Sequence, residues 1–144
     1  MRSALATDSD LLNAIEDRGY RITSTRRVIA GAIEESPDGF TAEQICGRVP
    51  GVGRATVYRA IKLFHEVEVI CKMALPDGAP RYAVDTGGRH HHHTICTRCR
   101  AVQDFRASTI ERVLKAIEAD VDGQITGHRM EIYVTCQTCL ASAD

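Results

Sequence analysis

The sequence predicts an α+β fold in two parts, with helices and a β-hairpin in the first part and a smaller α/β segment in the second. Apolar residues recur at helical spacing in four segments before residue 67, and two short alternating stretches follow them. Two CxxC motifs, at residues 96–99 and 136–139, then flank a further helical segment. Gly87-Gly88 separates the parts, so we expect domains at residues 1–86 and 90–144, joined by a hinge at residues 87–89.

Each of the first four helices is expected from a capping residue and an apolar face. Asp8 or Ser9 begins the first helix, and Thr23 or Ser24 begins the second. The third begins with a capping box over residues 41–44, and a glycine-rich turn leads into the fourth. The residues expected to face inward are Leu11, Leu12 and Ile15, then Val28, Ile29, Ala32 and Ile33, then Ile45, Cys46 and Val49, and finally Val57, Ile61 and Phe64.

A β-hairpin is expected after the four helices. Residues 69–73 and 81–85 alternate in polarity around Pro76-Asp77-Gly78, which is a turn sequence. Helices followed by a hairpin, with a short turn between the third and fourth helices, are typical of a winged helix-turn-helix. If the turn centres on Gly78, Cys71 and Asp85 lie directly opposite each other, close enough to share a metal ion.

The second part is expected to contain a short strand through the histidines, a strand at residues 101–105, one helix and a last strand at residues 129–134. The helix carries its apolar residues in one stripe, Ile110, Val113, Leu114 and Ile117. This part is too small to be stable without a metal or a partner chain.

We expect the chain to be cytoplasmic. Its 144 residues contain no apolar run of the roughly 20 residues that a membrane span needs, and the polar N-terminus lacks the apolar region of a secretory signal. In a reducing compartment, the six cysteines are expected to be metal ligands rather than disulfides.

Positive charge is concentrated in two stretches, although the net charge is −1. Residues 18–27 carry four arginines and no acid, and residues 48–62 carry three arginines, one lysine and no acid. Such localised charge indicates a nucleic-acid footprint. The alternative is that both stretches are ordinary solvated helix faces.

The two CxxC motifs predict a structural zinc site. Each motif can turn two thiolates toward one ion. Together the two motifs supply the four ligands of a tetrahedral site, Cys96, Cys99, Cys136 and Cys139. Zinc would then close the second part and contribute directly to its folding. The alternative, a pair of redox CxxC motifs, requires a thioredoxin-like βαβ context that the sequence lacks.

Four consecutive histidines, at residues 90–93, precede the first CxxC motif. In an extended segment alternate residues face opposite sides. One metal site would therefore take His90 and His92, and another would take His91 and His93. A solvated polar loop is the alternative.

Cys71 and Asp85 can complete one of these histidine pairs. A set of one Cys, one Asp and two His has intermediate softness and suits Zn²⁺. The alternatives are that Cys71 is a small buried side chain and that Asp85 only ends its strand.

Three groups of motifs match one known family. They are Arg21-Ile22-Thr23 with Arg26, the segment Ala55-Thr56-Val57-Tyr58-Arg59, and the four histidines followed by the two CxxC motifs. From about Leu11 to Leu140 the chain resembles the ferric uptake regulator (Fur) family, and within it the zinc uptake regulators. The resemblance implies an N-terminal winged helix-turn-helix joined to a C-terminal α/β dimerisation domain. It also implies a homodimeric, metal-dependent repressor that binds pseudo-palindromic double-stranded operator DNA and controls metal-uptake genes.

The resemblance implies three metal positions. The four-cysteine site is structural. The regulatory set maps to Cys71, Asp85, His91 and His93. The third set maps to His90, His92, Glu111 and His128.

The regulatory metal is expected to be zinc. Iron and peroxide sensors of the family usually take a histidine from the loop before the third helix, and residues 37–41 contain none. Cys71 also favours zinc, whereas Asp104 resembles an acid that gives iron or manganese a harder, higher-coordinate site. The alternative is therefore an iron-, manganese- or peroxide-sensing regulator of the same family.

On this hypothesis, the fourth helix of each protomer enters the major groove of DNA. Tyr58 and Arg59 are the candidates for base contact, because an arginine can bond guanine bidentately. Arg21, Arg54 and Thr56 are the candidates for phosphate or groove contact. The alternative for Tyr58 is packing on the flank of the helix.

Two other classes of protein are weaker hypotheses. A metalloenzyme is disfavoured because the sequence contains no HExxH motif and no H-x-E paired with P-C-x-x-C. A zinc-buffering or interaction module would bind metal without sequence-specific DNA binding. We therefore expect no enzymatic activity, no membrane association and no small organic substrate.

Overall fold

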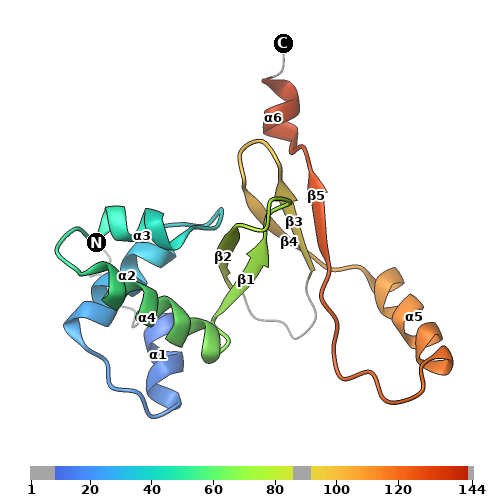
Figure 1. Ribbon diagram of the computed structural model, residues 1–144, viewed down its shortest axis with the longest axis horizontal. Coiled ribbons are helices and arrows are strands. Elements are labelled where there is room, and N and C mark those ends of the chain that lie inside the picture. The colour runs from blue at the N-terminus through green and yellow to red at the C-terminus, as the bar shows by residue number, and fades with distance from the viewer. Residues whose placement is uncertain (1–8, 86–91, 143–144) are drawn as a thin grey trace, which may run out of the picture. The chain divides into compact units, whose positions relative to one another are not determined.

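The computed structural model describes residues 9–85 and 92–142, and the chain divides into two compact units, Met1–Thr86 and Gly87–Asp144 (Figure 1). Both helices and strands are present, so the fold is α+β as predicted. The expected hinge at residues 87–89 and the candidate cap Asp8 lie outside the described residues. No helix within the described ranges is long and apolar enough to cross a bilayer.

The first unit consists of four helices and a hairpin. In chain order these are α1 (Asp10–Asp17), α2 (Ser24–Glu34), α3 (Ala42–Arg48), α4 (Arg54–Glu66), β1 (Ile70–Ala74) and β2 (Pro80–Val84). Ser9 precedes α1, but its side chain does not cap the helix, because its hydroxyl donates to the Glu34 carboxylate instead. The Thr23 hydroxyl accepts the N–H of Arg26 at 3.2 Å and so caps α2 as expected. Thr41 and Gln44 form the expected capping box of α3.

An aliphatic core joins the helices to β1. Its buried side chains include Leu11, Leu12, Ile15, Ile29, Ile33, Ile45, Val49, Val57, Ile61, Phe64 and Ile70. Cys46 is half-buried against the same core, as expected. The prediction is wrong for Val28, which is 53% exposed, while Ala30 is buried. Successive helical residues are about 100° apart, so a face centred on Ile29 and Ile33 leaves Val28 on the solvent side.

The hairpin has a different register from the expected one. β1 and β2 are antiparallel with Cys71 opposite Ala83, so the prediction that Cys71 lies opposite Asp85 is wrong. The loop explains the difference, because Gly78 adopts a φ of 83° as its last residue. A three-residue loop that ends in a left-handed glycine centres the hairpin on Asp77 rather than on Gly78.

Phe40 connects the hairpin to the helices. Its N–H donates to the carbonyl of Tyr82 at 2.7 Å, and the N–H of Tyr82 donates back at 2.8 Å. The two rings stack with their centroids 5.7 Å apart. The buried Arg81 donates to the carbonyls of Asp38 and Gly39 at 3.3 Å. The hairpin is therefore held against the loop that precedes α3.

The second unit contains a three-stranded sheet. Its elements are β3 (His92–Cys96), β4 (Val102–Phe105), α5 (Ser108–Ile117), the short 3₁₀ helix η1 (Glu118–Asp120), β5 (Glu131–Val134) and α6 (Gln137–Ala141). β3 is central and pairs antiparallel with β4 and parallel with β5. The expected strands and helix are present, and η1 and α6 are additional.

The second unit buries few side chains. Within residues 92–142 the buried residues are His92, Ile95, Cys96 and Val102. The apolar stripe of α5 is not part of this core, because α5 has no buried residue and Val113 and Ile117 are exposed. Ile110 and Leu114 of the same stripe are half-buried.

Candidate metal centres and nucleic-acid interface

Four cysteine thiols meet at one edge of the sheet in the second unit. Cys96 ends β3 and Cys136 follows β5, and these strands are parallel, so their C-terminal ends lie at the same edge. Cys99 lies in the turn after β3, and Cys139 lies in α6. All four sulfur atoms are within 4.8 Å of one another.

The sulfur spacing fits a tetrahedral metal site. The Sγ atoms of Cys96 and Cys139 are 3.9 Å apart, and those of Cys99 and Cys136 are 3.7 Å apart. A zinc–sulfur bond of about 2.3 Å gives a tetrahedron with an edge of about 3.8 Å. A disulfide requires sulfur atoms about 2.05 Å apart, and all four cysteines are free. The cluster therefore fits a zinc ion held by four thiolates.

The four thiols influence one another's protonation. The Cys96 sulfur accepts the N–H groups of Cys136 at 3.4 Å and Cys99 at 3.5 Å, which lowers the pKa of Cys96 to about 6. The thiol of Cys136, hydrogen-bonded to Cys139, raises the pKa of Cys139 to about 12. The backbone thus stabilises one thiolate, while further negative charge in the cluster requires a cation.

A second cluster contains His92, Glu111 and His128, whose ligand atoms also lie within 4.8 Å of one another. Glu111 Oε1 is 3.3 Å from His92 Nε2 and 3.6 Å from His128 Nε2. The His92 side chain is 2% exposed, and neither His92 Nε2 nor Glu111 Oε1 has a partner in hydrogen-bonding geometry within the described residues. Buried polar atoms without hydrogen bonds are costly, and two imidazoles with one carboxylate are suitable ligands for a divalent metal. The fourth predicted ligand, His90, lies outside the described residues.

His93 contacts a different acid, Asp104. β3 and β4 place the two residues directly opposite each other, and His93 Nε2 is 3.3 Å from Asp104 Oδ1. The adjacent pair, His92 and Phe105, projects from the other face of the sheet. The expected alternation therefore holds for His92 and His93, while His91 lies outside the described residues.

Cys71 and Asp85 share one face of the hairpin although they are not direct partners. Cys71 is opposite Ala83, and Asp85 lies two residues beyond Ala83, with its N–H bonded to the Val69 carbonyl at 2.9 Å. Such diagonal neighbours are about 7–8 Å apart in a regular antiparallel pair. Both side chains are half-buried, and both residues belong to the first unit, whereas His93 belongs to the second.

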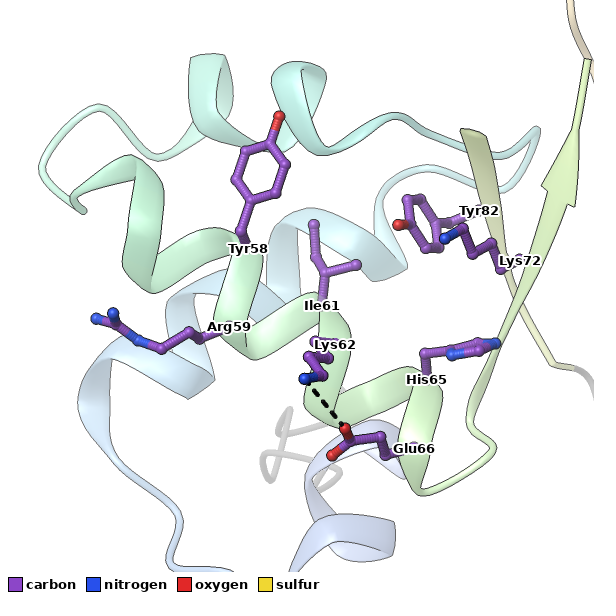
Figure 2. Close-up of a pocket in the computed structure, with 8 residues that line it drawn as sticks. All are labelled: Tyr58, Arg59, Ile61, Lys62, His65, Glu66, Lys72 and Tyr82. Carbon is purple, nitrogen blue, oxygen red and sulfur yellow. Dashed lines mark ion pairs between the residues drawn. The ribbon is translucent and has the colours of Figure 1, made fainter. Parts of the chain in front are cut away.

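The exposed face of α4 carries most of the residues predicted to contact DNA. Tyr58 and Arg59 are both exposed and point in different directions, with Tyr58 directed toward α3 (Figure 2). Arg59 Nη2 donates to the Thr56 hydroxyl at 3.2 Å. A groove between α4 and the hairpin is lined by Tyr58, Arg59, Ile61, Lys62, His65, Glu66, Lys72 and Tyr82.

The other two predicted DNA contacts lie in different settings. Arg21 is exposed before α2, where its carbonyl accepts a hydrogen bond from the Arg26 guanidinium. Arg54 pairs with Glu43 of α3, whose carboxylate also accepts the Tyr58 hydroxyl. No sequence pattern indicates Glu43, because its contact with Arg54 joins two helices across 11 positions.

Comparison with known proteins decides the family. A sequence model of the ferric uptake regulator family matches residues 17–133. The chain belongs to this family. Fur-family proteins are metal-responsive transcriptional regulators that bind operator DNA and act as dimers, so this chain is a metal-responsive transcriptional regulator.

Three relatives carry names that refer to different signals or metals. The chain is 28% identical over 134 residues to the peroxide-responsive repressor PerR of Staphylococcus saprophyticus, covering 90% of this chain and 89% of that protein. It is 32% identical over 132 residues to the ferric uptake regulation protein of Bacillus subtilis, covering 87% and 89%. A solved zinc-bound manganese uptake regulator has a TM-score of 0.67 at 32% identity, covering 88% and 98%. These relatives do not single out the zinc branch that the sequence led us to expect.

Proposed function

We propose that this Fur-family regulator is a zinc-dependent repressor that binds pseudo-palindromic operator DNA as a homodimer and controls metal-uptake genes. The observation that carries the choice of metal is Cys71, half-buried on the hairpin face that it shares with Asp85. A thiolate in the regulatory set favours zinc, whereas Mn²⁺ prefers oxygen ligands.

The two units have different proposed roles. Residues 1–86 form a winged helix-turn-helix that binds DNA, residues 87–89 form a hinge, and residues 90–144 form a dimerisation domain. The order of α1 to α4 followed by the hairpin supports the first assignment. The exposed stripe of α5, with Val113 and Ile117, supports the last, because a small unit with few buried residues gains stability when a partner chain covers such a stripe.

Three metal sites belong to the proposal. The structural site is Cys96, Cys99, Cys136 and Cys139. The third site is His90, His92, Glu111 and His128. The regulatory site is Cys71, Asp85, His91 and His93, whose sulfur, oxygen and nitrogen atoms would donate to a zinc ion acting as a Lewis acid.

The regulatory residues act by linking the two units. Cys71 and Asp85 come from the first unit, and His91 and His93 come from the second. When the two pairs are not joined, the units sample many relative orientations, and few of these present both α4 helices of a dimer to successive major grooves. Joining the pairs shifts the population toward the orientation that binds DNA.

Side chains of α4 then contact the operator. Arg59 bonds guanine bidentately and Tyr58 contacts a neighbouring base. Arg21 and Thr56 are the proposed phosphate contacts. Arg54, which the sequence placed with them, is held by Glu43 in the protein without DNA.

A regulator that senses manganese, iron or peroxide is the second candidate function. The contact of 3.3 Å between His93 and Asp104 favours it. A carboxylate added to the regulatory set makes that set harder and raises its coordination number, which suits Mn²⁺ or Fe²⁺.

Fluorescence anisotropy with the protein's own promoter distinguishes the two candidates. Binding is measured at buffered free Zn²⁺, and separately at buffered Mn²⁺ and Fe²⁺, with the structural zinc left in place. Zinc-dependent binding that Cys71→Ala abolishes supports the proposal. Binding that requires Mn²⁺ or Fe²⁺, survives Cys71→Ala and is lost in Asp104→Asn supports the second candidate. Cys46→Ala is the matched control, because it removes a half-buried thiol of the same unit that lies outside the ligand set.

A further inference from the structure

An ion-pair cluster on the surface of the first unit joins α3 to α4. The carboxylate of Glu43, in the first turn of α3, accepts hydrogen bonds from both terminal nitrogens of Arg54, with Nη1 2.5 Å from Oε2. The Tyr58 hydroxyl donates to Oε1 of the same carboxylate at 2.5 Å. Arg54 begins α4, and its guanidinium carbon is 6.0 Å from the centre of the Tyr58 ring. One carboxylate therefore contacts two side chains at the start of the helix proposed to read DNA.

Helix capping does not account for Glu43. An acid in the first turn interacts favourably with the helix dipole, but the capping box of Thr41 and Gln44 already satisfies this end of α3. The pairing with Arg54 is bidentate, which makes it stronger and more directional than a single contact. The hydrogen bonds from Arg54 and Tyr58 also hold the pKa of Glu43 below its usual value, so the carboxylate is charged at neutral pH.

Glu43 also changes the positive charge that α4 offers to DNA. Phosphates carry the same charge in every sequence, so each arginine that binds one contributes to binding of any duplex. Arg59 donates to the neutral Thr56 hydroxyl, whereas Arg54 faces a carboxylate with both of its terminal nitrogens. Arg54 must exchange Glu43 for a phosphate before it can add to nonspecific binding.

We propose that Glu43 is a specificity-determining positioning residue, which withholds Arg54 from DNA phosphates of any sequence and holds Tyr58 in place for base contact. The expected consequence is weaker nonspecific binding rather than tighter operator binding. This inference rests on the proposed DNA-binding function. It adds a negatively charged residue to a surface that was identified by its positive charge.

Glu43→Gln tests the proposal, because glutamine keeps the size of the side chain and removes its charge. Binding of the metal-loaded protein to operator and to a scrambled duplex of equal length is measured by anisotropy between 50 and 200 mM salt. Release of one arginine is expected to steepen the plot of log affinity against log salt for the scrambled duplex by about 0.9. A slope change of 0.9 is about a 3.5-fold larger change of affinity between 200 and 50 mM salt, and it is expected for both duplexes. The ratio of operator to scrambled affinity should fall as well, because the operator alone loses the base contact of a positioned Tyr58.

Two further variants separate this effect from a general change in charge. Glu16→Gln removes an acid from α1, outside the α3–α4 cluster, and should leave the salt slope and the affinity ratio unchanged. Arg54→Gln should cancel the effect of Glu43→Gln on the salt slope when the two are combined.

Each other outcome overturns the assignment. An unchanged slope and ratio with a lower melting temperature would make Glu43 a purely structural residue. A loss of operator affinity alone would make it a direct operator contact. An effect that persists in the Arg54→Gln background would reflect bulk charge. Failure of the wild-type protein to prefer operator over scrambled DNA would instead refute the proposed function itself, and with it this inference.

Discussion

Replacing Cys99 with serine tests whether a metal holds the second unit together. The substitution removes one of the four sulfur ligands at the ends of β3 and β5. Structural zinc contributes about 10–16 kcal/mol to the folding of small zinc-binding peptides at neutral pH. The free energy of unfolding of a whole domain is about 5–15 kcal/mol, so losing the ion is expected to unfold the second unit completely. Burial of Ile95 and Val102, which contributes about 1.5–3 kcal/mol for each side chain, cannot offset that loss.

Hydrogen exchange resolved by segment is the appropriate assay, together with zinc content by elemental analysis. Cys99→Ser should contain less zinc and lose amide protection in β3 and β5, while α2 and α4 keep theirs, because the first unit has its own aliphatic core. Cys46→Ser is the matched control. It changes a half-buried thiol of the first unit and should retain the zinc and the protection of both units.

One result would refute this reasoning. If Cys99→Ser is free of zinc and yet β3 and β5 exchange as slowly as in the wild-type protein, the sheet does not depend on the four-thiolate site. The stability of the second unit would then have to come from a partner chain that covers α5.

Three further predictions concern the cap of α3, the DNA contacts and the second metal cluster. Thr41→Ala removes the hydroxyl of the capping box and should lower the free energy of unfolding of the first unit by about 1 kcal/mol, measured by urea denaturation with Thr41→Ser as the control. Arg59→Ala should reduce discrimination between the operator and an operator with one changed base by about 1–3 kcal/mol, and an equal loss of affinity for these two duplexes would contradict the role of Arg59. Arg21→Ala should instead weaken binding to every duplex and reduce the salt dependence of the affinity. Glu111→Gln should weaken metal binding at the His92 cluster in a chelator competition without changing the structural zinc, and an unchanged affinity would exclude Glu111 as a ligand.

The parts of the fold that depend on local sequence could be predicted. The helix caps were predicted from Thr23 and Thr41, and the buried face of α4 was predicted from the spacing of Val57, Ile61 and Phe64. Both succeed because a helix is specified by neighbours within one or two turns. The error at Val28 arose because an apolar residue at the edge of a face cannot be assigned to core or solvent from spacing alone.

The candidate sites depend on contacts between distant segments, and these were predicted less completely. The spacing of the two CxxC motifs indicated the four-cysteine cluster, but the parallel pairing of β3 with β5 that brings the motifs together has no local pattern. The prediction that Cys71 lies opposite Asp85 was wrong because of the turn. Gly78 adopts the left-handed conformation as the last loop residue, and this shifts the centre of the hairpin by one residue. The contact of Glu43 with Arg54 could not be predicted, because it depends on how α3 packs against α4.

The distribution of ligands between the units limits how a metal can control DNA binding. The helix α4, proposed to contact DNA, packs into the hydrophobic core of the first unit. The four cysteines lie in the second unit, and so do His92, Glu111 and His128. Of the proposed sets, that of Cys71, Asp85, His91 and His93 draws on both units. On the proposed assignment, metal acts on the placement of α4 through this set, and the His92 cluster acts through the second unit, by its stability or its proposed dimerisation.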